Sequence, residues 1–237
     1  MTHGSVNATT GRLGAASACL LAVLSATPLQ AAEIGQRFAS VQAFVDSHPQ
    51  GRADVTKGYG DLVGAGRRDW AASVSLEDPE IGSAQRIVVL AQQADGSYEL
   101  VAQGPTRSTF GGTAHHDLDD VRVRQASVFV SWSWNWHGCG GSSTQQIRFY
   151  RQQWRVIGAE FTRASAVETP DGYDGGDVVR ISHNLLTGAI VMNLKPADGN
   201  GKPKTMRLTH APVTELLDDD FGEDTGAVEE FSTYGSC

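Results

Sequence analysis

The stretch SVFVSWSWNW, from Ser127 to Trp136, decides the fold class. Its apolar face carries Val128, Val130, Trp132, Trp134 and Trp136, and the residues between them are Phe129, Ser131, Ser133 and Asn135. Because successive side chains of a strand point to opposite faces, this alternation predicts an antiparallel strand with one buried face. Two valines share the tryptophan face, so a core role is favoured over stacking on sugar rings or on a partner.

Period-two patterns continue on both sides of this stretch, and turn signals separate them. The other predicted strands are 69–76, 86–91, 98–102, 121–124, 145–150, 154–161, 178–182, 189–194 and 205–210, with turns at 94–96, 125–126 and 198–201. About nine strands and abundant glycine predict an all-β antiparallel meander, arranged as an irregular propeller, a sandwich or a barrel. Helical spacing of apolar residues predicts one N-terminal helix over 34–46.

Residues 1–31 read as a secretory signal peptide. Arg12 is the one charged residue before Glu33, and an apolar stretch at 13–26 is followed by small residues at the expected cleavage point. We expect a periplasmic or secreted protein with no membrane span. A lipoprotein anchored at Cys19 is the weaker alternative, because most of the apolar stretch follows that cysteine. The expected organisation is a signal peptide at 1–31, a single β-rich domain at 32–216 and an acidic tail at 217–237.

Two cysteines, Cys139 and Cys237, remain after cleavage of the expected leader. An oxidising compartment permits a disulfide bond between them. The sequence leaves open whether they form that bond or stay as two thiols.

The formal net charge of −8 argues against a nucleic-acid-binding protein, which needs a basic face. The acidic excess is concentrated at the end of the chain: residues 211–237 hold eight acidic side chains and no Lys or Arg. Such a tail is either a solvated end or a means of steering a basic partner.

The standard catalytic signatures are missing from the sequence: it has no HExxH, GxSxG, SxxK, P-loop or GxGxxG after a strand. We therefore predict a protein that is not an enzyme. The alternative is a periplasmic hydrolase with a convergent site at His115, His116, Asp117 and Asp119. Consecutive histidines on a strand point to opposite faces, which favours an ordinary solvated turn over a shared metal site.

The stretch GDLVGAGRRDW, at 60–70, has the frame of a calcium loop, in which oxygen ligands alternate along the chain. Asp61 and Asp69 keep that frame as candidate metal ligands. Val63 and Ala65 stand at two ligand positions without a side-chain oxygen. The loop is predicted to be a degenerate calcium site, either empty or binding calcium weakly; no other cofactor is expected.

A polar segment at 163–176 is long for a hairpin connection, and long loops are often functional. Tyr173, with Asp171 and Asp174 beside it, is the predicted partner-binding group, because tyrosine is favoured at the centre of interfaces. The alternative is a connection without a binding role.

Four motifs in one order carry a family resemblance: GDLVGAGRRDWAASV, RIVVLAQQADGSYELVAQ, IRFYRQQWRVIGAEF and NLLTGAIV. Together they resemble a family of secreted or periplasmic bacterial proteins that reads approximately GDLNGDGxxDxAxV, DGxYxLxA, YKFRYQDGxWxLIG and NFLTGxxx. The resemblance covers about two-thirds of the chain. Some members are similar to immunity proteins that protect bacteria from peptidoglycan-hydrolysing effectors of type IV secretion systems.

The resemblance implies an irregular propeller-like fold similar to that of periplasmic lysozyme inhibitors, with calcium at the GDLNGDG loop. In this chain Asp61 and Asp69 match its ligands, whereas Val63 and Ala65 depart from the pattern. The implied function is non-enzymatic binding and inhibition of a lysozyme-like peptidoglycan hydrolase. A hydrolase and a structural envelope protein are the alternatives.

Overall fold

The computed structural model describes residues 32–47, 57–78, 82–104, 107–108, 115–136, 139–169, 172–196, 201–212 and 214–216. By its internal contacts the chain divides into residues 1–30 and 31–237, and everything described lies in the second unit. None of the described helices has the length and apolarity that a bilayer crossing needs. The predicted signal peptide and the acidic tail at 217–237 lie outside the described residues.

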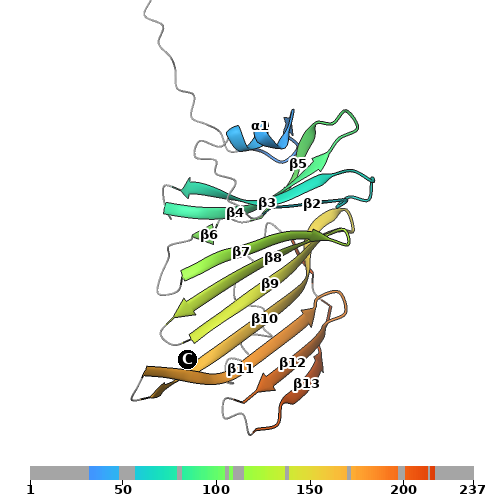
Figure 1. The fold of residues 1–237 in the computed structure, drawn as a ribbon. Helices are drawn as coiled ribbons and strands as arrows, with labels where there is room; N and C mark the ends of the chain where they lie inside the picture. Colours follow the sequence, from blue (N-terminus) through green and yellow to red (C-terminus); the bar gives the residue numbers. More distant parts are fainter. Residues whose placement is uncertain are drawn as a thin grey trace, which may run out of the picture. The chain divides into compact units, whose positions relative to one another are not determined.

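The described strands form two antiparallel sheets (Figure 1). The six-stranded sheet A has the order β1 (Arg37–Phe38), β5 (Tyr98–Gln103), β4 (Gly82–Gln92), β3 (Asp69–Asp78) and β2 (Lys57–Gly60), with β6 (Arg107–Ser108) paired to β4. The eight-stranded sheet B has the order β13 (Lys204–Thr209), β12 (Ala189–Lys195), β11 (Gly172–Asn184), β10 (Gln153–Thr169), β9 (Cys139–Tyr150), β8 (Ser127–Trp136) and β7 (His115–Arg124), with β14 (Glu215–Leu216) paired to β10. The all-β prediction is confirmed: neither sheet closes into a barrel, and most strands pair with their neighbours in sequence.

Sheet A is buried on both faces. Trp70, Ala72 and Val74 of β3 pack with Phe44 of helix α1 (Val41–Asp46) in one cluster. Ala71, between them on the opposite face, belongs to a second cluster shared with sheet B. Two-sided burial explains why the predicted strand 86–91 is apolar at every position after Arg86.

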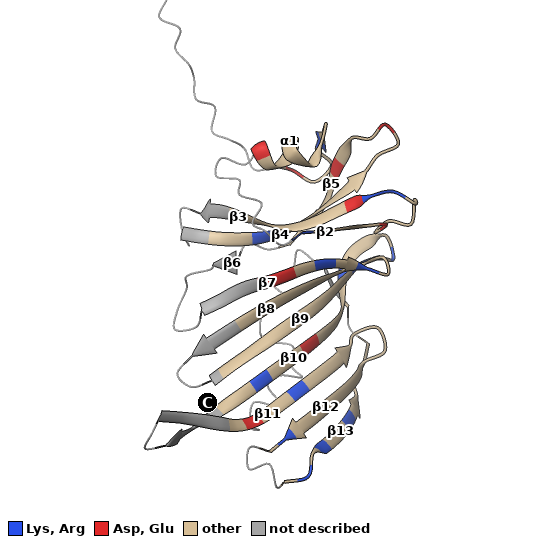
Figure 2. Ribbon diagram, in the orientation of Figure 1, with Lys and Arg blue, Asp and Glu red and all other residues tan. Residues whose placement is uncertain are grey.

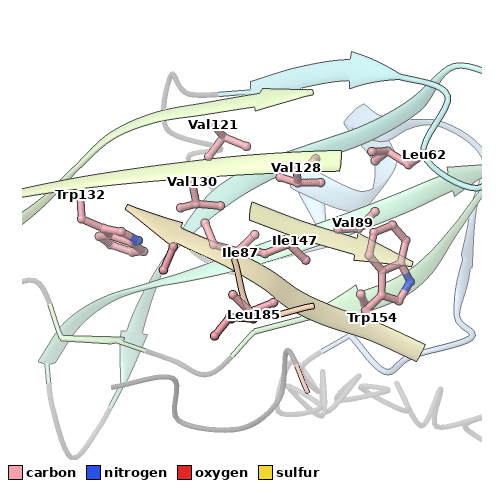
Figure 3. Close-up of a cluster of buried hydrophobic side chains, with 14 residues drawn as sticks. Leu62, Ile87, Val89, Val121, Val128, Val130, Trp132, Ile147, Trp154 and Leu185 are labelled. Carbon is pink, nitrogen blue, oxygen red and sulfur yellow. The ribbon is translucent and has the colours of Figure 1, made fainter. Parts of the chain in front are cut away.

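The second cluster joins the two sheets and is the largest core (Figure 3). Sheet A contributes Leu62, Ala71, Ile87, Val89 and Ala102, and sheet B contributes Val121, Val128, Val130, Trp132, Ile147, Trp154, Val156 and Ala159, joined by Leu185 from the turn after β11. Val128, Val130 and Trp132 are 0%, 0% and 6% exposed, so the core prediction for this face of β8 is confirmed at these three residues. The side chains of Trp134 and Trp136 lie outside the described residues.

The N-terminal helix is shorter than predicted. It spans six residues and begins after Ser40, whose Oγ accepts a hydrogen bond from the amide of Ala43 at 3.1 Å. Gly35 has a φ of +91° and donates its amide to Leu100, which sets Arg37–Phe38 as β1 against β5. The spacing of apolar residues suggested one helix because Phe38 and Phe44 enter the same cluster from two different elements.

Two segments predicted as a turn and a loop are strands, and a glycine-rich segment outside the predicted strands is one as well. His115 to Asp120, predicted as a turn, is the first half of β7, and the glycine-rich segment after Trp136 becomes β9 at Cys139. Most of the polar segment at 163–176 belongs to β10 and β11. Polar and glycine-rich composition predicted loops, but pairing with at least one neighbouring strand extends these segments regardless of composition.

Candidate functional site

The candidate site is a two-stranded arm formed by the ends of β10 and β11. Register pairs run from Ala166 opposite Gly175 to Thr169 opposite Gly172. The pairing of β9 with β10 stops at Ala164, and the pairing of β12 with β11 starts at Val178. Within the described residues no other strand pairs with the arm, so it extends beyond sheet B with both edges unpaired.

The arm begins at an irregularity in the pairing. The register shifts between Ala164 and Ala166, where the single residue Ser165 of β10 stands against two residues of β11, Gly176 and Asp177. Gly176 lies against it: a Cβ added at Gly176 would be 2.3 Å from the carbonyl oxygen of Ser165. Ser165 Oγ also donates to the carbonyl of Asp177 at 3.4 Å. A bulge that contains a glycine bends a strand pair, so this junction sets the direction of the arm.

The predicted partner-binding residues fall on this arm, but not in a loop as expected. Tyr173 stands opposite Glu168 and Asp174 opposite Val167 in the antiparallel register. Asp171, at the tip, lies outside the described residues. Strand pairing fixes the backbone at Tyr173 and Asp174, which lowers the entropy cost of binding relative to a loop.

In the loop between β2 and β3, backbone amides donate hydrogen bonds to the loop's own carboxylate. Asp61, which is exposed, accepts hydrogen bonds from the amides of Ala65 at 2.9 Å and Gly66 at 3.0 Å. Gly64 and Gly66 have φ values of +77° and +67°, which turn the backbone toward that carboxylate.

Asp69 is fully buried at the start of β3. Its Oδ2 accepts from the amides of Leu62 at 2.8 Å and Val63 at 3.1 Å, and its Oδ1 accepts from the amide of Gln92 at 2.9 Å. All four carboxylate oxygens of Asp61 and Asp69 therefore face amide donors.

These residues do not fit a calcium ion. Ca²⁺ requires six to eight oxygen ligands, whereas amide hydrogens occupy both carboxylates, and Val63 and Ala65 offer no side-chain oxygen. Among the described residues, no group of three or more His, Cys, Asp or Glu side chains is placed to hold a metal.

The thermal unfolding midpoint of the natural chain should therefore be the same in excess calcium and in EDTA. Val63→Asp combined with Ala65→Asp restores two oxygen ligands, and its midpoint should rise with calcium concentration by mass action. Differential scanning fluorimetry of both chains across a calcium titration measures this. A midpoint of the natural chain that rises with calcium would contradict the conclusion that its loop does not bind the ion. An unchanged midpoint of the double variant would show that the loop backbone does not have the geometry of a calcium site.

The strand register separates the two histidines of the His115–Asp119 segment, which was the alternative convergent site. His115 and His116 occupy consecutive positions of β7, opposite Asn135 and Trp134, so they belong to opposite faces. Asp119 accepts a hydrogen bond from Ser133 Oγ at 2.8 Å. The side chains of both histidines and of Asp117 lie outside the described residues, as do the side chain of Cys139 and all of Cys237.

His183 is a partly buried titratable residue that the sequence analysis missed. It stands on β11 opposite Ala159 and Ile190, and neither of its ring nitrogens has a hydrogen-bond partner. Burial lowers the pKa of this imidazole, and the charge of His210 lowers it further. The alternation Val179, Ile181, His183 was the signal that placed it on an apolar face. It therefore acts as a neutral packing residue at physiological pH.

No family model matches the chain, and neither a curated protein nor a solved structure matches it.

Proposed function

We propose that this chain is a non-enzymatic protein of the cell envelope that binds and inhibits a lysozyme-like peptidoglycan hydrolase, as an immunity protein does. The support is the order of the four sequence motifs, the expected export leader and the excess of acidic residues. A hydrolase effector of a type IV secretion system is the proposed partner, and the periplasm or the medium is the proposed location.

The arm is the observation that carries this proposal. Inhibition by occlusion needs a narrow element that can enter a substrate cleft, and this element must be held by a rigid scaffold. The arm is two strands wide, and the sheet at its base is held by continuous pairing of β9, β10, β11 and β12. Tyr173 and Asp174 are proposed to contact the hydrolase, with the acidic charge increasing the rate of encounter with a basic enzyme.

The propeller-like arrangement implied by the resemblance belongs to the same proposal. Its support is that nearly all strands run as an antiparallel meander. A comparison with an experimentally determined structure of the same family would test it.

Inhibition of the hydrolase encoded nearest to this chain tests the function. Titration should abolish peptidoglycan hydrolysis near a one-to-one ratio, and Tyr173→Ala with Asp174→Asn should weaken inhibition at least about tenfold. The matched control is Tyr59→Ala with Asp95→Asn, which changes an exposed tyrosine and an exposed aspartate on and beside sheet A. Equal inhibition by the two double variants would remove the arm from the interface, and absence of inhibition by the natural chain would reject the function.

A further inference from the structure

The far end of sheet B carries an apolar cluster that includes no residue of sheet A or α1. Its buried members are Val179 and Ile181 on β11 and Ile190 and Met192 on β12, between 1% and 6% exposed. Phe161, Leu194 and Leu208 pack at its margin. All seven come from β10 to β13, and no residue of sheet A belongs to the cluster.

These side chains stand on one face of the sheet. Ile181 is directly opposite Met192, and Val179 is directly opposite Leu194. An uncovered sheet face would leave such side chains open to water, and burying each large apolar side chain contributes about 1.5 to 3 kcal/mol. Such a face is normally covered by another part of the chain.

The longest internal gap that ends on sheet B is too short to supply this cover. The six residues 109–114 connect β6 of sheet A to β7, and six residues span at most about 21 Å. The distance across the sheet from β7 to β11 is already about 19 Å, so this segment cannot reach the cluster and return. The segments 48–56 and 79–81 begin and end on sheet A or α1, and each remaining gap holds one to four residues.

The described chain begins in the other cluster of sheet A, which packs against α1. Residues 1–31 join the described chain at Ala32, which is buried between α1 and sheet A. That cluster lies on the face of sheet A opposite the core shared with sheet B.

The C-terminal segment begins beside the strands that carry the cluster. Leu216 of β14 pairs with Arg155 of β10, the strand next to β11, and Arg155 Nη1 donates to the carbonyl of Thr214 at 3.0 Å. The 21 residues after Leu216 can extend up to about 70 Å. They supply apolar side chains at Leu217, Phe221, Val228, Phe231 and Tyr234.

Charge supports the same assignment. Residues 217–237 contain seven acidic side chains and no Lys or Arg. β12 and β13 carry Lys195, Lys204 and Arg207 and no acidic residue (Figure 2). Arg163 stands opposite Val179 and Lys204 opposite Leu194, so basic positions flank the cluster on its own face.

We propose that the acidic C-terminal segment, residues 217–237, docks on the apolar face formed by Val179, Ile181, Ile190 and Met192 and completes the core of sheet B. This inference does not rest on the proposed function. It makes the segment a structural part of the domain, with its apolar residues on the cluster and its acidic residues against the flanking Lys and Arg.

A spin label on the segment tests the docking. In a full chain with Cys19, Cys139 and Cys237 replaced by serine, a nitroxide at Val228→Cys should strongly broaden the methyl resonances of Ile190 and Met192, independently of protein concentration. Leu90, in the cluster under α1, should keep its intensity. The matched control is the same label at Ala94→Cys, an exposed turn position of sheet A, which should spare Ile190 and Met192. Broadening no greater at Ile190 than at Leu90, or broadening that appears only as concentration rises, would overturn the proposal.

A second measurement needs no cysteine replacement. Phe221→Ala with Val228→Ala and Phe231→Ala should accelerate hydrogen exchange at the amides of Ile190 and Met192 at least about tenfold, with the exchange of Leu90 unchanged. Asp218→Asn with Asp219→Asn and Asp220→Asn changes the same segment without removing apolar area and should have a smaller effect. Unchanged exchange at Ile190 in the alanine variant would overturn the proposal.

Discussion

Replacing Asp69 with alanine should lower the free energy of unfolding by roughly 3 to 5 kcal/mol, a large part of the stability of an ordinary domain. The carboxylate accepts three amide hydrogens and has no exposed surface. Without it, the amides of Leu62, Val63 and Gln92 lose their acceptor together, and each buried unsatisfied donor costs about 1 to 3 kcal/mol. Chemical denaturation monitored by circular dichroism measures the loss.

Asp61→Ala is the matched control for this prediction. Asp61 also accepts from two loop amides, but it is exposed, so water can replace it. We expect its loss to cost about 1 kcal/mol. If Asp69→Ala and Asp61→Ala destabilise equally, burial of the carboxylate is not what makes Asp69 essential.

Gly58→Ala should separate the two sheets locally and cost about 1 to 3 kcal/mol. A Cβ at Gly58 would lie 2.7 Å from the backbone nitrogen of Val123 on β7, and no side-chain rotation relieves a clash with backbone. At Gly60 the added Cβ would lie 2.5 Å from Val123 Cγ1, which is a side-chain atom. Equilibrium denaturation of the single variants measures both losses.

The identity of the clashing atoms gives this prediction its control. Val123→Ala removes Cγ1, so it should rescue much of the loss caused by Gly60→Ala and little of that caused by Gly58→Ala. Gly64→Ala, where a Cβ meets nothing within 4 Å, reports the cost of positive φ alone. Equal rescue at Gly58 and Gly60 would mean that the backbone contact between β2 and β7 does not limit the approach of the sheets.

The sequence predicted the regular part of the fold because burial and periodicity agree there. Ser127–Trp136 was predicted with its observed bounds, since its polar and apolar residues alternate without interruption. β2 was missed because two of its four residues are glycines, selected by the contact with Val123 rather than by strand propensity. The arm was read as a loop for a related reason, because only the pairing of β10 with β11 makes its polar residues extended.

The loop between β2 and β3 was predicted in part. Its frame, with Asp61 and Asp69, is visible in the sequence, as is the loss of oxygen ligands at Val63 and Ala65. The hydrogen bond from the amide of Gln92 to Asp69 is not visible in the sequence, because Gln92 lies 23 positions away on β4. His183 shows the same limit, since its lack of polar neighbours depends on strands that are distant along the chain.

The short-range hydrogen bonds of the loop between β2 and β3 have a consequence for the order of folding. Its bonds join residues only four to seven positions apart, from Asp61 to Ala65 and from Leu62 to Asp69. Contacts of such short range form within microseconds, before distant strands can meet. The loop can therefore bring β2 and β3 together early and offer Asp69 Oδ1 as a docking point for Gln92 when β4 arrives. Nucleation of sheet A would then proceed at the same rate with or without calcium in the refolding buffer.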